Sequence, residues 1–354
     1  MTEPNTTLMP QERDDDRATE TRLRPAALAD FVGQSTIREQ IGLLIEAARQ
    51  RNDAVDHVLL YGPPGLGKTT LAQIIAHELN VSVRTTSGPA IEHQGMLASI
   101  LTGLEHQEVL FVDEIHRLPR PVEEALYPAM EDFAFDWVAG KGAGAQALRL
   151  DLSHFTVIGA TTRVGALGGP LRDRFGIVLR LDYYDPEELA RIIVRSAGLL
   201  DCAITQDAAD MLAARSRGTP RIANRLLRRA RDFAEVRSDG TITQEVVAAT
   251  LTLLGIDDLG LDEMDRRVLL YLCDVMKGRP VGLHALAVGI QEEPDTVEDV
   301  IEPFLIRLGY LARTPRGRIA TGKGFAYMGL SAPAEAAGDP QQLLAFTDEE
   351  SVDG

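Results

Sequence analysis

A glycine-rich run between two apolar segments carries the clearest chemistry in this chain. Residues 62–69 read Gly-Pro-Pro-Gly-Leu-Gly-Lys-Thr and fit the pattern G-x-x-x-x-G-K-[ST]. The run follows Val58–Tyr61, an apolar stretch typical of a buried strand, and precedes a segment with helical spacing. A turn of this kind presents free backbone N–H groups and a helix N-terminus to a phosphate group. Residues 58–79 therefore predict a strand, a phosphate-binding loop and a helix.

The side chains of this loop indicate which phosphate carrier it binds. Lys68 can reach the β- and γ-phosphates of a nucleoside triphosphate, and the Thr69 hydroxyl can ligate Mg²⁺. A Gly/Pro turn that binds nothing is the alternative, and the strand and helix beside the loop count against it. We therefore expect ATP and Mg²⁺ as cofactors. The expected ligands in this loop are Gly62, Gly65, Gly67, Lys68, Thr69 and Thr70.

Two later apolar runs end in polar side chains suited to ATP hydrolysis. Residues 108–114 predict a strand that ends in Asp113 and Glu114. At the carboxyl end of a strand neighbouring the loop, Asp113 would hold Mg²⁺, directly or through water, and Glu114 would polarise the attacking water. A second run ends at 159–163, where Thr162 can sit between the loop and the two acids. Surface acids without a role are the alternative, and the phosphate loop counts against it.

Arginines in two further segments can reach the transferred phosphoryl group. Arg174, in the run 170–176, stands just before the last expected strand. An arginine supplied to the γ-phosphate raises the rate by about 10³–10⁵. If this sheet edge faces a neighbouring subunit, Arg174 acts in trans, whereas a surface salt bridge is the other reading. Arg221, in the Gly-Thr-Pro-Arg run 218–221, opens a helix and can fold over the phosphates.

Strands and helices alternate from residue 58 to residue 198, and a separate insertion interrupts them. This alternation predicts an α/β fold, a parallel sheet with helices on both faces and the phosphate loop at its carboxyl edge. Residues 133–152 instead show two period-2 segments around a glycine-rich link, which predict a β-hairpin. It either folds back onto its own domain or projects as a partner-binding arm. The expected strands are 58–61, 81–84, 109–112, 155–160 and 177–181, and the expected helices 68–79, 94–104, 121–131 and 186–198.

Beyond residue 205 the strand-like runs stop and a helical pattern takes over. Residues 205–255 predict a small helical domain. From residue 261, three helices and two short strands around a Thr-Pro-Arg-Gly turn follow the plan of a winged helix. The predicted division is a disordered acidic tail at 1–20, a large ATPase domain at 21–200, a helical lid domain at 201–258, a winged-helix DNA-binding domain at 259–330 and a second disordered acidic tail at 331–354.

The net charge of −17 argues against nucleic acid as a partner, but the distribution of charge weakens that argument. Residues 1–20 hold six acids and two arginines, and residues 331–354 hold six acids and no base. Local charge is the better guide, and residues 306–323 hold five bases and no acid. The two cysteines have no metal or redox spacing, and no apolar run is long enough to span a membrane, so we expect a cytoplasmic protein. The five bases are Arg307, Arg313, Arg316, Arg318 and Lys323.

The combined motifs resemble the AAA+ ATPases and, more closely, the RuvB family of bacterial Holliday-junction branch-migration motors. The resemblance covers about residues 21–330 and implies an AAA+ domain, a lid and a winged helix. It also implies a homohexamer that pumps double-stranded DNA in recombination, DNA repair and the SOS response. The runs that carry it are 24–34, Asp113 to Leu118, the hairpin, 158–163, 218–221 and 313–318.

The resemblance also implies roles for single residues and for partner proteins. The adenine would lie between Tyr184 and the segment 23–33, with Leu23 and Arg24 in contact. A RuvA-like junction-binding protein would dock on the hairpin, and a RuvC-like resolvase would join the complex. The implied catalytic set is Asp113 and Glu114 as metal and water residues, Thr162 as first sensor, Arg174 as trans finger and Arg221 as lid sensor. The implied DNA contacts are Arg313, Arg316 and Arg318.

Two other classes of ATPase share the nucleotide motifs. A clamp-loader-like or initiator-like ATPase uses ATP as an assembly switch, but it would not need the hairpin insertion. A protein-remodelling ring often carries an aromatic residue in its pore loop, and residues 88–96 contain no Phe, Tyr or Trp. Stimulation of ATP hydrolysis by DNA or by an unfolded protein separates the motor from the remodeller.

Overall fold

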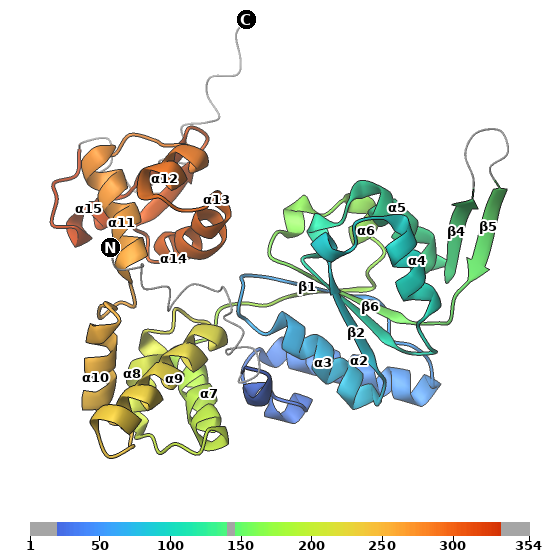
Figure 1. The fold of residues 1–354 in the computed structure, drawn as a ribbon, viewed down its shortest axis with the longest axis horizontal. Coiled ribbons are helices and arrows are strands. Elements are labelled where there is room, and N and C mark those ends of the chain that lie inside the picture. Colours follow the sequence, from blue (N-terminus) through green and yellow to red (C-terminus); the bar gives the residue numbers. More distant parts are fainter. Residues whose placement is uncertain (1–19, 140–145, 334–354) are drawn as a thin grey trace, which may run out of the picture. The chain divides into compact units, whose positions relative to one another are not determined.

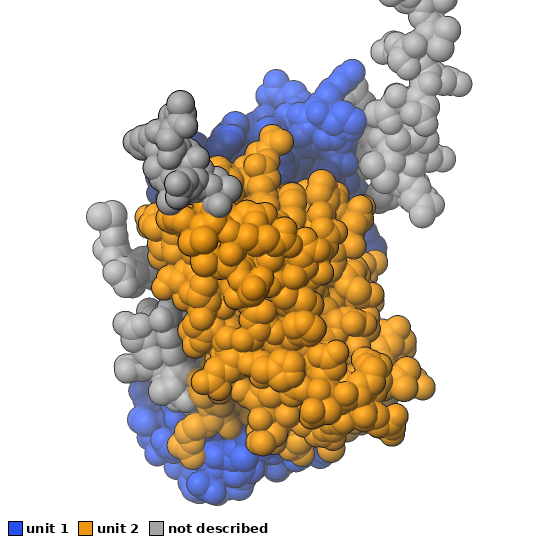
Figure 2. Space-filling view, turned by 90° about the vertical axis from the view of Figure 1, so that its right-hand side faces the viewer, with its two compact units in different colours: residues 1–12, 193–354 blue, residues 13–192 orange. Residues whose placement is uncertain are grey.

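The chain divides into two compact units. The computed structural model describes residues 20–139 and 146–333. One unit ends at Ile192 and the other begins at Ile193, and Figure 2 colours them separately. The two predicted tails lie outside the described residues except for Glu20 and residues 331–333, as does the predicted hairpin tip. In the part of the chain that is described, no helix is long and apolar enough to cross a membrane.

A five-stranded parallel sheet forms the centre of the first unit. The strand order is β2-β3-β6-β1-β7, and every pair is parallel. The apolar residues of β1, β3 and β6 are buried, because helices cover both faces of a parallel sheet. The predicted α/β fold is therefore confirmed. The strands are β1 (Val58–Tyr61), β2 (Val83–Ser87), β3 (Val109–Asp113), β6 (Thr156–Thr161) and β7 (Ile177–Arg180).

Helices cover this sheet on two sides. Figure 1 shows α2 and α3 on one face and α4 and α5 on the other. On the second face, Leu101 and Leu126 belong to one buried cluster with Leu110 and Val157 of the sheet. Fully burying a side chain of this size contributes about 1.5–3 kcal/mol. The helices and short helical turns of this unit are η1 (Leu28–Asp30), α2 (Ser35–Arg51), α3 (Lys68–Leu79), η2 (Gly88–Ala90), α4 (Gln94–Thr102), η3 (Ile115–Arg117), α5 (Arg120–Glu131), η5 (Val164–Ala166) and α6 (Gly169–Arg172). The boundary between the two units falls within the next helix, α7 (Pro186–Leu199).

The predicted hairpin is present between α5 and β6. Strands β4 (Ala134–Ala139) and β5 (Gln146–Asp151) pair antiparallel. At the root, Phe135 is buried in the domain core and Trp137 packs against the same cluster. Farther along, Leu148 is 54 % exposed, and Figure 1 shows the two strands standing clear of the helices. The root is therefore packed on its own domain while the strands extend outward.

The second unit contains two helical groups. The first is α8 (Gln206–Ala214), α9 (Pro220–Arg237) and α10 (Gln244–Leu253). The second holds the three helices and the ribbon expected of a winged helix, with a further short helix at its end that the sequence analysis did not predict. Its elements are α11 (Glu263–Leu270) with the π-helical turn η6 (Tyr271–Val275), α12 (Leu283–Ile290), α13 (Pro294–Thr296) with the π-helical turn η7 (Val297–Ile301), α14 (Glu302–Arg307), β8 (Leu311–Thr314), β9 (Gly317–Ala320) and α15 (Gly322–Tyr327).

A buried histidine joins the sheet to the root of the hairpin. His57 Nδ1 accepts a hydrogen bond of 2.9 Å from the Val157 N–H group of β6. The proton of the neutral ring is therefore on Nε2, which donates to the Met130 carbonyl of α5 at 3.0 Å. Burial lowers the pKa of His57, because a charged imidazole would lose its hydration there. A neutral His57 thus ties α5 to the sheet just before the hairpin begins.

This arrangement predicts a pH-dependent part of the stability. An unfolded histidine takes up its proton near pH 6.5, whereas folded His57 has a lowered pKa. The unfolded state therefore binds more protons as the pH falls below about 6.5, and stability is lost in that direction. We expect wild-type protein to lose more stability between pH 7.5 and pH 5 than His57→Gln, which keeps both hydrogen bonds and does not titrate. The urea concentration at the unfolding midpoint is measured for both proteins across this pH range. An equal fall of this midpoint in wild type and His57→Gln would contradict the prediction.

Candidate functional site

The phosphate loop adopts a backbone conformation that requires glycine. Gly62, Gly65 and Gly67 have φ angles of 141°, 79° and 103°. A Cβ atom on Gly62 would also lie 2.4 Å from the Leu181 carbonyl oxygen. Side chains are strained at these angles, so the glycines form a curved row of backbone amides before α3.

Lys68 begins α3 and is held above this row. Its Nζ atom donates to the carbonyl oxygens of Gly62 at 2.7 Å and Pro63 at 2.8 Å. Lys68 is buried, and Thr69 and Thr70 follow it in the first turn of α3. The predicted phosphate ligands are thus gathered at a helix N-terminus, where the helix dipole favours an anion.

The two predicted acids stand at the end of β3. Asp113 is its last residue, and one of its carboxylate oxygens accepts a 2.9 Å hydrogen bond from the Glu114 N–H group. Glu114 has a left-handed backbone with φ of 45°, which costs about 1–3 kcal/mol for a residue with a side chain. Its carboxylate pairs with Arg117 at 3.0 Å. The two carboxylates at the end of β3 therefore have different partners, the Glu114 N–H group for Asp113 and Arg117 for Glu114.

The predicted adjacency of the acidic strand and the loop strand is wrong. Strand β3 does not neighbour β1, because β6 lies between them. Thr161 of β6 pairs with Tyr61, the last residue of β1, so Thr162 follows at the strand end between loop and acids. That position of Thr162 is the one predicted. An additional threonine hydroxyl can therefore face the space that separates the two motifs.

His116 is a residue that sequence reasoning missed. Its Nδ1 atom lies 2.9 Å from the Thr161 hydroxyl, which also accepts a 3.0 Å bond from the Arg163 N–H group. This contact joins the turn after Glu114 to the end of β6. His116 lies in the run Asp113 to Leu118 that carries the resemblance, but no role was predicted for it. His116 therefore ties the segment that follows Glu114 to the strand end that precedes Thr162.

An aromatic cluster adjoins the loop on the side predicted for the base. The Tyr184 hydroxyl donates to the Leu66 carbonyl at 3.2 Å, and burial raises the pKa of Tyr184. A Cβ atom on Gly33 would lie 2.8 Å from the Tyr184 ring, and one on Gly67 would lie 3.3 Å from Phe31. The segment 23–33, Tyr184 and the loop therefore converge. Leu23 in this segment is buried and Arg24 is half-buried.

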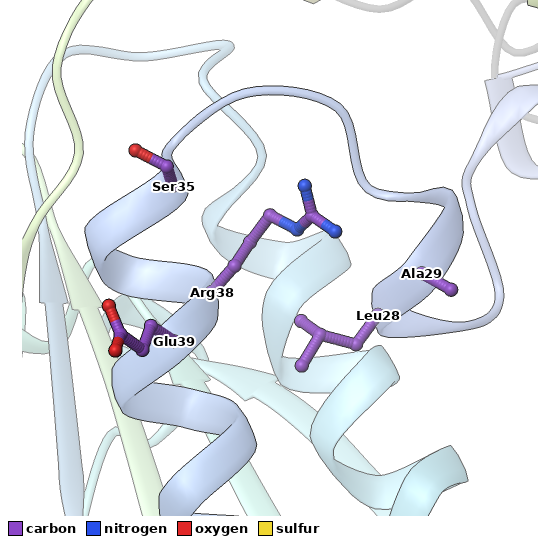
Figure 3. A pocket seen from close by; sticks show the side chains of 5 residues that line it. All are labelled: Leu28, Ala29, Ser35, Arg38 and Glu39. Atoms are coloured by element: carbon purple, nitrogen blue, oxygen red, sulfur yellow. The ribbon is translucent and has the colours of Figure 1, made fainter.

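A separate pocket lies beside this segment. Figure 3 shows its lining from η1 and the start of α2, and its volume is about 350 Å³. The Nε atom of Arg38 is buried there without a hydrogen-bond partner. The pocket contains none of the predicted phosphate ligands, so it is distinct from the loop. Its lining residues are Leu28, Ala29, Ser35, Arg38 and Glu39.

The two arginines predicted to reach the phosphates lie in different units. Arg174 rests on α5, where its guanidinium group pairs with Glu131 at 2.9 Å and covers the Tyr127 ring at 4.4 Å. It also donates to the Pro170 carbonyl at 2.6 Å. Arg221 is in the first turn of α9 in the second unit.

The three arginines predicted to bind DNA have unequal environments. Arg316 is exposed in the turn between β8 and β9. In contrast, Arg313 and Arg318 pair with the fully buried Glu302 of α14, at 2.5 Å and 3.2 Å. Glu298 lies 3.8 Å and 3.5 Å from the same two arginines. Two of the three bases therefore also anchor the ribbon to the winged-helix core.

Comparisons with known proteins agree with this arrangement. Three family models match successive parts of the chain: the Holliday junction DNA helicase RuvB P-loop domain over residues 23–181, the RuvB AAA lid domain over 184–257 and the RuvB C-terminal winged helix domain over 258–329. These matches cover both units.

Relatives over the full length show the same relation. The Holliday junction branch migration complex subunit RuvB of Acidothermus cellulolyticus is 58 % identical over 332 residues, which are 94 % of this chain and 90 % of that protein. The Thermotoga maritima RuvB Holliday junction branch migration motor matches with a TM-score of 0.81 and 50 % identity, over 88 % of this chain and all of that chain. The phosphate loop, the acids at the end of β3, the helical lid and the winged helix accordingly place this chain in the RuvB family of AAA+ ATPases.

Proposed function

We propose that this protein is an ATP-driven motor that pumps double-stranded DNA through a homohexameric ring and drives branch migration of Holliday junctions. The observation that carries the proposal is the match to RuvB across the P-loop, lid and winged-helix domains in one chain. A nucleotide site and a DNA-binding module in one chain are the two parts that such a motor needs. Through branch migration the protein takes part in DNA recombination, in DNA repair and in the SOS response to DNA damage.

The first unit supplies the residues that bind and hydrolyse ATP. Lys68 and the loop amides hold the phosphates, and Thr69 and Asp113 supply oxygen donors of the kind that Mg²⁺ prefers. When bound, Mg²⁺ neutralises developing charge on the phosphates. Among the described residues no cluster of three or more His, Cys, Asp or Glu forms a metal cage, which suits an ion held mainly by phosphates and water. Glu114 orients the attacking water, and Thr162 senses the γ-phosphate.

Residues outside the loop complete the proposed site. Leu23, Arg24 and Tyr184 enclose the adenine, and Arg221 approaches the nucleotide from the lid. Arg174 acts on the ATP of the neighbouring subunit. Its contacts with Tyr127 and Glu131 are a resting position, which Arg174 leaves when it reaches that ATP.

The remaining proposals concern partners and domain limits. The outward strands of the 133–152 hairpin dock a RuvA-like junction-binding protein, and a RuvC-like resolvase completes the complex in the cytoplasm. The proposal is supported by the two strands, which stand clear of the helices and carry the exposed Leu148. We place the domain limits at 21–200, 201–258 and 259–330.

Variants of the phosphate loop and the acids test the ATPase. Lys68→Ala is expected to abolish nucleotide binding or turnover, because the loop loses its charged ligand. Glu114→Gln is expected to bind ATP and trap an assembled ring while turnover falls at least about 10²-fold. Turnover, nucleotide binding and movement of a synthetic four-way junction are measured together. Normal ATP turnover in Glu114→Gln would contradict the proposed role of Glu114 in orienting the attacking water. Stimulation of ATP hydrolysis by an unfolded protein but not by DNA would contradict the proposed motor function.

Mixed rings test the trans role of Arg174. Arg174→Ala is expected to bind ATP yet hydrolyse it about 10³–10⁵-fold more slowly. Mixing it with Lys68→Ala should restore part of the turnover, since each variant keeps one half of a composite site. Rings are isolated with two different affinity tags so that both variants are present. Absence of recovery at every mixing ratio would count against trans action.

The ribbon turn provides the test of DNA binding. Arg316→Ala is expected to weaken duplex binding equally on different sequences and to lower the log–log salt slope by about 1, because one phosphate contact is lost. Arg313 and Arg318 are less suitable, since their removal also leaves Glu302 buried without a partner. Exposed Arg237, at the end of α9, is the control substitution. Equal salt slopes for Arg316→Ala and wild type would show that Arg316 does not contact the phosphate backbone of the DNA.

A further inference from the structure

We propose that Arg217 links the lid to the winged helix through buried ion pairs with Asp262 and Asp265, and that this contact, the clasp, transmits lid movement to the DNA-binding domain. The inference rests on the proposed function and adds the residue that transmits the movement. Arg217 lies in the turn between α8 and α9 and is 6 % exposed. It stands four residues before Arg221, the proposed lid sensor. Arg217 and Gly218 both have left-handed backbones, with φ of 51° and 70°, so the turn is sharp.

The partners of Arg217 belong to the winged helix and the segment before it. Its Nη2 atom lies 2.5 Å from Asp265 and 3.2 Å from Asp262, and its Nε donates to the Gly260 carbonyl at 3.0 Å. Its guanidinium group also lies 4.5 Å from the centre of the Phe304 ring of α14. One side chain of the lid therefore contacts three separate parts of the next domain.

These carboxylates are also the N-terminal cap of α11. Asp262 accepts hydrogen bonds from the N–H groups of Met264 and Asp265, and Asp265 accepts one from Asp262. Asp265 is fully buried and Asp262 nearly so. Burial raises the pKa of Asp265, the charge of Arg217 opposes that rise, and the charge of Asp262 adds to it. The cap of α11 thus depends on the lid arginine, because removing either partner leaves the other buried without its ion pair.

The segment that joins the two domains is held as well. Asp257 accepts hydrogen bonds from the N–H groups of Leu259 and Leu261, and the Tyr327 hydroxyl of α15 donates to it at 2.5 Å. The Arg266 side chain of α11 donates to the Gly255 carbonyl at 2.7 Å. Such a short, bonded connection does not act as a flexible hinge. The lid and the winged helix therefore move as one body, with the buried clasp as its central contact.

The position of the clasp in the chain links it to the nucleotide. Arg217, in the turn, and Arg221, in the first turn of α9, lie on either side of Pro220. A shift of this helix start when Arg221 engages a phosphate moves Arg217 with it. Arg217 then carries α11 and the attached wing ribbon, since its partners are fixed in that domain. Arg217 is a positioning residue for DNA movement and has no chemical role in hydrolysis.

The test measures how rigidly the lid is joined to the winged helix, and how much junction movement accompanies each ATP hydrolysed. The paired variant Arg217→Met/Asp265→Asn removes the clasp together with its most buried carboxylate, while Asp262 keeps its hydrogen bonds to the N–H groups of Met264 and Asp265. The variant Arg217→Lys keeps the charge but not the forked contacts. Arg237→Met is the control. Spin labels are placed at Val236 on α9 and Val288 on α12, both exposed, after Cys202 and Cys273 are replaced by alanine. The labelled distance is measured by pulsed electron resonance with ADP and with a non-hydrolysable ATP analogue.

In wild type and Arg237→Met we expect one narrow distribution of label-to-label distances with either nucleotide. The distribution should be broad in the paired variant and of intermediate width in Arg217→Lys. ATP hydrolysis without DNA should stay within about twofold of wild type, while junction movement per ATP hydrolysed should fall at least fivefold. A narrow distance and normal coupling in the paired variant would overturn the proposal. If wild type moved no junction, the proposed function would fail, but the distance measurement would still decide whether Arg217 joins the domains.

Discussion

The pairing of β6 between β1 and β3 is the constraint on which the nucleotide site depends. It brings three strand ends to one edge of the sheet, with the loop after β1, Thr162 after β6 and the acids after β3. The apolar residues of these three strands are buried, as in a parallel sheet that helices cover on both faces. The strained backbone of Glu114 and the contact between His116 and Thr161 are held by this same packing.

Charge in this protein acts locally. The chain has a net charge of −17, yet the ribbon of the winged helix is rich in arginine. Part of that basic charge is used inside the domain, because the buried Glu302 requires partners and takes Arg313 and Arg318. Exposed Arg316 remains at the turn, where a phosphate backbone of any sequence can meet it. An acidic protein can therefore present a small basic contact that does not read bases.

Three arginines illustrate how one side chain type serves different tasks. Arg174 is half-buried on α5, where it covers the Tyr127 ring and pairs with the exposed Glu131. Arg217 is buried with two carboxylates, where separation of the charges is costly, and it joins two domains. Arg318 supports the fold of the ribbon. Among the three, Arg217 is the most buried, and both of its carboxylate partners are buried as well.

The sequence by itself determined the α/β class, the phosphate loop, the acids, the hairpin and the winged helix, because each depends on local spacing or on backbone angles that only glycine adopts readily. It did not determine that β6 separates β3 from β1, since strand order depends on which helices cross which face. His116, His57 and Arg217 were also beyond its reach. Their partners lie 43 to 100 residues away in the chain, and only packing of distant segments creates the buried, low-dielectric surroundings that give these side chains their roles.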